Sequence, residues 1–156
     1  MSRRIDAASR LIRAPASRIY EAFATADAME TWLPPEGMTG KMLAFAFRES
    51  GGYRLRLTYG DQRGAPGKTS DGTDEVEVRF AKLVPHERIE QIVTFKSNDP
   101  AFAGEMRISW SFESAESGTI VTVRCEDVPA GISPEDHQTG LNSTLSHLAA
   151  FVTAAG

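Results

Sequence analysis

Cysteine is almost missing from this sequence, since Cys125 is the single one among 156 residues. One cysteine cannot form a disulfide within the chain, and such scarcity suits a reducing compartment, so we expect a cytoplasmic protein. Basic residues are also in slight deficit, with 17 lysines and arginines against 21 acidic residues and a net charge of -4. This balance argues against nucleic-acid binding, which normally requires a basic patch.

Long apolar runs are absent as well. No stretch approaches the roughly 20 residues that cross a bilayer, and the basic start at residues 1–6 lacks the apolar core of a signal peptide. Hydrophobic residues nevertheless make up 41% of the chain and charged residues 24%, which is ordinary for a globular protein. We therefore expect one soluble domain over residues 1–156, without membrane insertion.

The spacing of apolar residues predicts strands bracketed by helices. Two short helices are expected after Pro15, and the second has Asp27 as its cap, Glu30 as the reciprocal partner and Pro34-Pro35 as its end. From about residue 41 the apolar period changes to two, which indicates hairpin-linked strands of an antiparallel sheet. The alternating runs lie at residues 43–47, 53–59, 76–80, 91–95, 106–112 and 121–125.

Three of these runs allow a more specific prediction. The first run should place Leu43, Phe45 and Phe47 on one apolar face. The next two runs carry arginines and glutamates on their polar faces, so Glu75 and Glu77 should face Arg54 and Arg56 if the strands pair.

The last predicted element is a helix from Ser133 to about Thr153, ~30 Å long and able to cross a whole sheet. Its apolar stripe has one face to bury against the strands, which gives an α+β fold. Gly140 in its middle costs ~1 kcal/mol relative to alanine, which indicates either a close approach to the sheet or room for a ligand. The stripe consists of Leu141, Leu145, Leu148 and Val152.

Several short motifs occur in a characteristic order. They are Ala14-Pro15 with Ile19 and Phe23, Thr31-Trp32, Gly51-Gly52-Tyr53, Pro85 with Arg88-Ile89, Gly118-Thr119, and the segment 129–136 leading to Gly140-Leu141 and Leu145. Over about residues 8–152 the chain thereby resembles the START-like (SRPBCC) superfamily. Within it, the chain resembles the bacterial proteins related to the activator of the ninety-kilodalton heat-shock protein ATPase.

This resemblance implies a helix-grip fold, in which a curved antiparallel sheet wraps around a long C-terminal helix and two short helices follow the first strand. It also implies a lipid-binding-like cavity between sheet and helix, which often holds an apolar small molecule. Many relatives carry tryptophan after the helix glycine, where this chain has Leu141. If that tryptophan closes the cavity in relatives, the cavity should be roomier here.

Residue patterns for catalysis or metal binding are scarce. His86, His137 and His147 lack the spacing of a chelating pair, and Cys125 has no neighbouring histidine. The sequence also has no GxSxG motif, glycine-rich phosphate loop or HExxH motif. We therefore assign no catalytic residue, and we expect no cofactor and no bound metal.

The inward apolar face of the sheet is the best candidate for a site. Gln91 shares that face, so its amide either orients a ligand or is satisfied by the protein itself. Trp32 and Met38 either guard the mouth of a cavity or fill a local core. The candidate ligand-binding residues are Trp32, Met38, Phe45, Tyr53, Leu55, Gln91, Phe95, Ile108, Trp110, Leu141 and Leu145.

Three functions remain open at this point. The first is non-enzymatic binding of a hydrophobic small molecule, which the lack of a catalytic pattern favours. The second is an enzyme of the cyclase or hydrolase type that uses Gln91, a tyrosine or a loop carboxylate such as Asp99. The third is a co-chaperone-like activator of the heat-shock protein 90 ATPase, which the resemblance implies. An exposed edge strand would also make a homodimer reasonable.

Overall fold

The computed structural model describes residues 4–34, 37–59, 73–95 and 104–154. The chain begins with strand β1 and the short helices α1 and α2, continues through six strands, and ends in the long helix α3. The elements are β1 (Ile5–Ile12), α1 (Ala16–Glu21), α2 (Ala26–Trp32), β2 (Met38–Ala46), β3 (Gly52–Tyr59), β4 (Thr73–Val84), β5 (Arg88–Phe95), β6 (Glu105–Ala115), β7 (Gly118–Glu126) and α3 (Pro134–Ala154).

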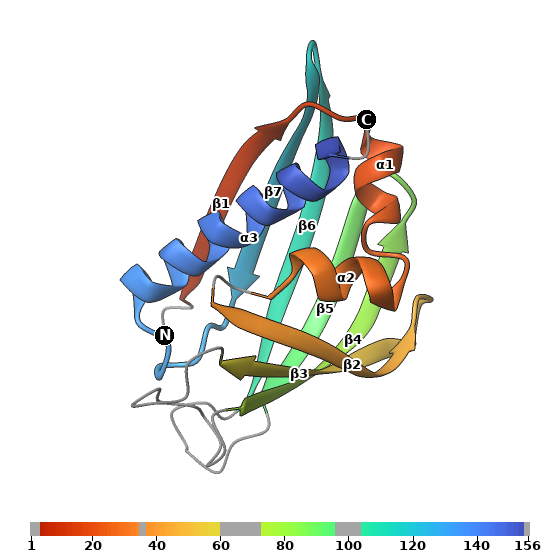
Figure 1. The fold of residues 1–156 in the computed structure, drawn as a ribbon. Coiled ribbons are helices and arrows are strands. Elements are labelled where there is room, and N and C mark those ends of the chain that lie inside the picture. The colour runs from red at the N-terminus through yellow and green to blue at the C-terminus, as the bar shows by residue number, and fades with distance from the viewer. Residues whose placement is uncertain (1–3, 35–36, 60–72, 96–103, 155–156) are drawn as a thin grey trace.

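The strands form one seven-stranded sheet in the order β1-β7-β6-β5-β4-β3-β2, and every neighbouring pair is antiparallel. The sheet curves, and all three helices lie on its concave side, with α3 crossing the strands (Figure 1). This is the predicted helix-grip arrangement. β1 and β2 form the two edges of the sheet, and a homodimer at such an edge stays a prediction.

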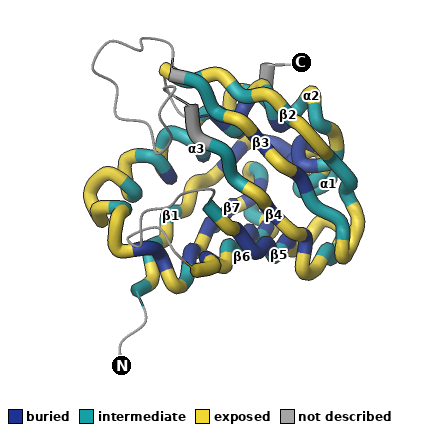
Figure 2. The backbone as a smooth tube through the Cα atoms, turned by 90° about the horizontal axis from the view of Figure 1, so that it is seen from below, coloured by how far each residue is buried: buried dark blue, intermediate teal, exposed yellow. Residues whose placement is uncertain are grey.

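Burial alternates along the strands because successive side chains point to opposite faces of a sheet (Figure 2). β7 is the clearest case, since Val121, Val123 and Cys125 are buried while the residues between them are not. On the outer face, Arg56 donates to Glu75 Oε2 at 3.0 Å across β3 and β4, which confirms the predicted pairing. Such an exposed ion pair contributes at most about 1 kcal/mol.

The prediction for Leu43 is wrong because β2 contains a bulge. The register between β2 and β3 shifts between Met42 and Ala44, so Leu43 is an extra residue in the strand. Leu43 is consequently 36% exposed, while Met42 and Phe45 pack against the core. A strict period of two cannot continue through such an insertion.

The predicted cap of α2 is also wrong. Thr25, with the extended backbone typical of an N-cap, accepts a hydrogen bond through its side chain from the Ala28 N–H at 3.2 Å. Asp27 therefore lies inside the first turn. Instead of reaching back to a cap, Glu30 accepts a 2.6 Å hydrogen bond from the Met42 N–H, which ties α2 to β2.

Helix α3 begins as predicted. The Asp136 N–H donates to Ser133 Oγ at 3.1 Å, and Leu145, Leu148 and Val152 are buried against the sheet. Within the described residues, no helix has both the length and the apolar character needed to span a membrane.

Aromatic rings fill one part of the space between the helices and the sheet. Phe23 packs edge-on against Trp32 and Trp110, with ring centroids 4.9 and 5.0 Å apart. The Phe112 ring also packs on Phe23, with centroids 5.9 Å apart, and the indole N–H of Trp32 donates to the Ala22 carbonyl at 2.8 Å. Phe23 lies in the turn between α1 and α2, and Trp32 ends α2, so the cluster fills the part of the interior beneath this helical segment.

Candidate ligand-binding cavity

An apolar cavity of about 360 Å³ lies between the N-terminal half of α3 and strands β3 to β6. Ligand pockets in proteins span roughly 300–1,000 Å³, so the volume of this cavity lies at the lower end of that range. Its strand walls are Tyr53, Leu55, Leu57, Val76, Val78, Val93, Phe95, Met106 and Ile108. Its other walls are Leu33, Ile132, Asp136, His137, Gly140, Leu141 and Thr144.

Part of the predicted site comes together in this cavity. Tyr53, Leu55, Phe95, Ile108 and Leu141 all contribute to its walls. They come from four different elements and share the inward face because of the strand pleat and the helix stripe. That any of them contacts a ligand stays a prediction.

The structure places the remaining predicted apolar residues elsewhere. Trp32 and Trp110 belong to the aromatic cluster, with ring centroids 5.9 Å apart, and Leu145 is buried core further along α3. Phe45 stacks on the Tyr53 ring at 6.2 Å without lining the cavity. Met38 lies in a different pocket.

Gln91 is buried in the middle of the sheet beside the cavity. Its Oε1 accepts a 3.2 Å hydrogen bond from the Trp110 indole N–H, but its Nε2 has no hydrogen-bond partner among the described residues. Burial raises the pKa of the Tyr53 hydroxyl, and the nearby Gln91 amide opposes part of that increase without reaching hydrogen-bond geometry. An unsatisfied buried donor costs about 1–3 kcal/mol, but Gln91 is not among the residues that line the cavity.

The end of the cavity at the start of α3 carries a polar cluster that the sequence analysis missed. His137 Nδ1 lies 2.6 Å from Asp6 Oδ2, and the Arg4 guanidinium donates to the same carboxylate at 2.8 Å. The hydrogen bond from Arg4 lowers the pKa of Asp6; burial opposes this effect, and His137 adds to it. Asp6 and His137 are far apart in sequence, so the search for closely spaced histidine pairs could not find them.

Gly140 faces open space in the cavity wall. A Cβ atom built on this residue would meet no atom within 4 Å, and Gly140 lines the cavity. Of the two interpretations of this glycine, a close approach to the sheet is therefore wrong. The other interpretation, room for a ligand beside the helix, agrees with the position of Gly140 in the cavity wall.

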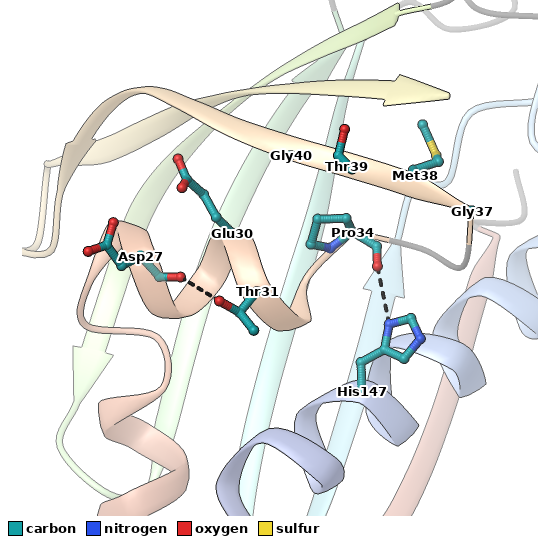
Figure 3. A pocket seen from close by; sticks show the side chains of 9 residues that line it. All are labelled: Asp27, Glu30, Thr31, Pro34, Gly37, Met38, Thr39, Gly40 and His147. Atoms are coloured by element: carbon teal, nitrogen blue, oxygen red, sulfur yellow. Dashed lines mark hydrogen bonds between the residues drawn. The ribbon is translucent and has the colours of Figure 1, made fainter. Parts of the chain in front are cut away.

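A second pocket of about 660 Å³ lies between α2, the start of β2 and α3 (Figure 3). Its polar groups are used in local hydrogen bonds: Thr31 donates to the Asp27 carbonyl at 2.9 Å, and His147 Nδ1 donates to the Pro34 carbonyl at 3.1 Å. Figure 3 shows His147 reaching from α3 to Pro34, two residues past the end of α2. The first bond lies within α2 and the second joins α3 to the segment after α2, so we do not assign a ligand to this pocket.

The described residues give little support for a metal site or for a cysteine nucleophile. No group of three or more histidine, cysteine or acidic side chains gathers there that could hold a metal ion. Burial raises the pKa of the Cys125 thiol to about 12, which leaves it protonated and a poor nucleophile. Asp99, the predicted loop carboxylate, lies outside the described residues.

The fold is similar to that of several solved bacterial proteins. A protein of Chromobacterium violaceum is 29% identical, with a TM-score of 0.83 over 95% of this chain and 96% of that one. A protein of Mesorhizobium loti is 13% identical, with a TM-score of 0.75 over 98% and 99% of the two chains. DynU16, from the dynemicin biosynthetic locus, is 15% identical with a TM-score of 0.69 over 97% of this chain and 48% of that one.

At such low identity the last two likenesses show the fold alone. No curated protein matches the sequence. A family model described as "Activator of Hsp90 ATPase homolog 1-like protein" matches residues 13–153, which include every element from α1 onward except the end of α3. The predicted resemblance is thus confirmed, and the chain belongs to the family of activator of Hsp90 ATPase homolog 1-like proteins.

Proposed function

We propose that this protein binds a hydrophobic small molecule, without catalysing a reaction, in the cavity beneath the N-terminal half of α3. The observation that carries this proposal is the apolar cavity of about 360 Å³ itself. The hollow opens to solvent, so a small molecule could enter it, and its apolar lining contrasts with the tightly packed aromatic cluster beside it.

The walls suit an apolar ligand with few polar contacts. Apolar surface comes from Leu55 in β3, Phe95 in β5 and Leu141 in α3. Burial of such surface favours binding by about 25 cal/mol per Å². Gln91, whose Nε2 is unpaired among the described residues, lies behind the lining residue Tyr53 and does not itself line the cavity, so it supports the wall rather than the ligand. A fold that commonly binds hydrophobic ligands adds to this support.

The two alternative functions have weaker support. Burial keeps the Tyr53 hydroxyl protonated, so Tyr53 is a poor general base. Gln91 has no ionisable group and can only donate or accept hydrogen bonds. The co-chaperone role rests on the family description alone.

The proposal can be tested with naphthalene and a variant that fills the cavity. We expect calorimetric titration to detect naphthalene binding to the wild-type protein. We expect Leu141→Trp to weaken that binding roughly tenfold, about 1.4 kcal/mol, because the indole would occupy the open space beside Leu141. The free energy of unfolding should change by less than about 1 kcal/mol, whereas overpacking a solid core costs about 1–3 kcal/mol.

Ala150→Trp is the matched control, since Ala150 is an exposed residue of the same helix. It should leave naphthalene binding unchanged. If the wild-type protein binds no naphthalene, or if Leu141→Trp lowers stability by several kcal/mol without altering binding, the cavity is not the ligand site. Native mass spectrometry of the purified protein gives a second readout, because a retained ligand adds its own mass.

A further inference from the structure

The polar cluster at the α3 end of the cavity has a defined geometry. Arg4 donates to both carboxylate oxygens of Asp6, at 2.8 Å from its terminal nitrogen and 3.3 Å from Nε. The same guanidinium also donates to the Pro129 and Ile132 carbonyls, which lie in the segment leading to α3. The cluster therefore joins the start of β1 to the start of α3 and fixes the position of the carboxylate.

This carboxylate sets the chemistry of the His137 ring. Arg4 holds the pKa of Asp6 below its usual range, so Asp6 is ionised at neutral pH and can only accept hydrogen bonds. At a separation of 2.6 Å, His137 Nδ1 must therefore carry the proton. In the neutral ring, Nε2 is then a hydrogen-bond acceptor.

His137 lines the cavity wall, and its side chain is only 13% exposed. Among the described residues, the hydrogen bond of this ring is the one between Nδ1 and Asp6, which leaves Nε2 for a ligand. A partly desolvated acceptor of fixed orientation is the kind of group that positions a ligand in an otherwise apolar pocket.

The charges around the ring favour a neutral donor over an acid. Asp6 and Asp136 are the carboxylates beside His137, and Asp136 also lines the cavity. The described lining residues include no lysine or arginine, and Arg4 is already engaged by Asp6 and two carbonyls. A carboxylate on the ligand would therefore meet like charge, whereas a hydroxyl would only donate its proton.

We propose that the ligand of this cavity is an apolar compound bearing a hydroxyl group, such as a phenol, and that His137 Nε2 accepts a hydrogen bond from that hydroxyl. This inference rests on the proposed function, because it assigns a polar end to the molecule that the apolar walls hold. Binding of the ligand makes and breaks no covalent bond. Asp6 and Arg4 act only by positioning the ring.

The test compares three probes of similar shape, naphthalene, 2-naphthol and 2-naphthoate, on the wild-type protein and on His137→Phe. We expect the ratio of the naphthalene Kd to the 2-naphthol Kd to fall roughly 2- to 10-fold in His137→Phe, which corresponds to one net hydrogen bond. Using the ratio removes any general effect of the substitution on the cavity. 2-Naphthoate should bind the wild-type protein more weakly than 2-naphthol.

His147→Gln is the matched control, because His147 lies on the same helix and lines the other pocket. It should leave the ratio unchanged. If naphthalene binds but the ratio is the same in His137→Phe, or if 2-naphthoate binds best, this inference is overturned while the proposed function stands. If no probe binds the wild-type protein, the proposed function fails and this inference fails with it.

A spectroscopic measurement decides the case in which His137→Phe does not fold. In a His86→Asn, His147→Gln protein, His137 is the only histidine, because the chain has three. We expect 2-naphthol to shift the ¹⁵N resonance of its Nε2, and naphthalene to leave that resonance in place. An equal effect of both probes would show that the ring takes no hydrogen bond from the ligand.

Discussion

The few polar side chains of the interior differ in how completely they are paired. Thr119 is fully engaged, since its hydroxyl donates to the Ala14 carbonyl at 2.8 Å. In Gln91 only the amide oxygen is paired within the described residues, since Oε1 accepts from the Trp110 indole N–H. The Asp6 carboxylate is paired with both Arg4 and His137. Because incomplete pairing has a cost in a buried site, the half-paired Gln91 lowers the stability of the fold relative to a fully paired amide.

The pairing of Asp6 predicts an effect on stability at low pH. The folded protein holds the pKa of Asp6 below its unfolded value of about 3.9. Its contribution is therefore fully present above that value and is lost as the pH falls through the lower pKa of the folded state. We expect Asp6→Asn to be less stable than the wild type at pH 7 and to lose less stability between neutral pH and about pH 3.

Urea unfolding at a series of pH values measures this difference. Glu116→Gln removes an exposed carboxylate from the turn between β6 and β7 and is the charge-matched control. If the free energy of unfolding depended on pH in the same way for Asp6→Asn and the wild type, this would contradict the pairing of Asp6 in the folded protein.

Among the elements, α2 shows where local sequence patterns are ambiguous. Thr25 and Asp27 both belong to residue types that cap helices, and the sequence alone could not tell which one does so. The structure selects Thr25 and uses Glu30 to hold β2 instead. Both features depend on how α2 lies against β2, which is a matter of tertiary packing.

Substitution of each candidate cap separates the two interpretations. We expect Thr25→Ala to lower the free energy of unfolding by about 1 kcal/mol, because the Ala28 N–H loses its acceptor. Asp27→Ala should cost less, since Asp27 contributes only a charge in the first turn. Urea unfolding of the two variants gives the comparison, and a larger loss for Asp27→Ala would contradict the observed cap.

The strands and α3 could be predicted because their apolar periods of 2 and 3.6 run over many residues. The bulge at Leu43 could not, because one inserted residue leaves no local signal. The same limit applies to the site. The alternation of side chains along the strands and the apolar stripe of α3 predicted a shared inward face for five residues that line the cavity wall: Tyr53, Leu55, Phe95, Ile108 and Leu141. These patterns could not show that Trp32 and Trp110 pack on Phe23. Contacts between distant segments, such as Asp6 with His137, depend on the whole fold.

At the scale of the whole molecule, the interior has a filled part and a hollow part. The rings of Phe23, Trp32 and Trp110 fill the part beneath α1 and α2. Near the start of α3, Gly140 and Leu141 leave the sheet partly uncovered, and the cavity lies there. A hollow lowers stability relative to a filled core, so the fold gives up stability in the region where we propose that a ligand binds.

Gly140→Ala tests this relation between stability and binding. We expect the substitution to raise the free energy of unfolding of the ligand-free protein by up to about 1 kcal/mol, because alanine favours the helix and its Cβ would meet no atom within 4 Å. The added methyl group takes space from the cavity, so naphthalene should bind more weakly. The increase in melting temperature that naphthalene gives the wild type should shrink accordingly.

Asn142→Ala separates the two effects. Asn142 is an exposed residue of α3, so alanine there should also favour the helix while leaving the cavity and naphthalene binding unchanged. Urea unfolding and thermal unfolding with and without naphthalene measure both quantities for each variant. A loss of stability in Gly140→Ala would mean that the Cβ meets packed atoms. Equal naphthalene binding by Gly140→Ala and the wild type would place the ligand away from this wall of the cavity.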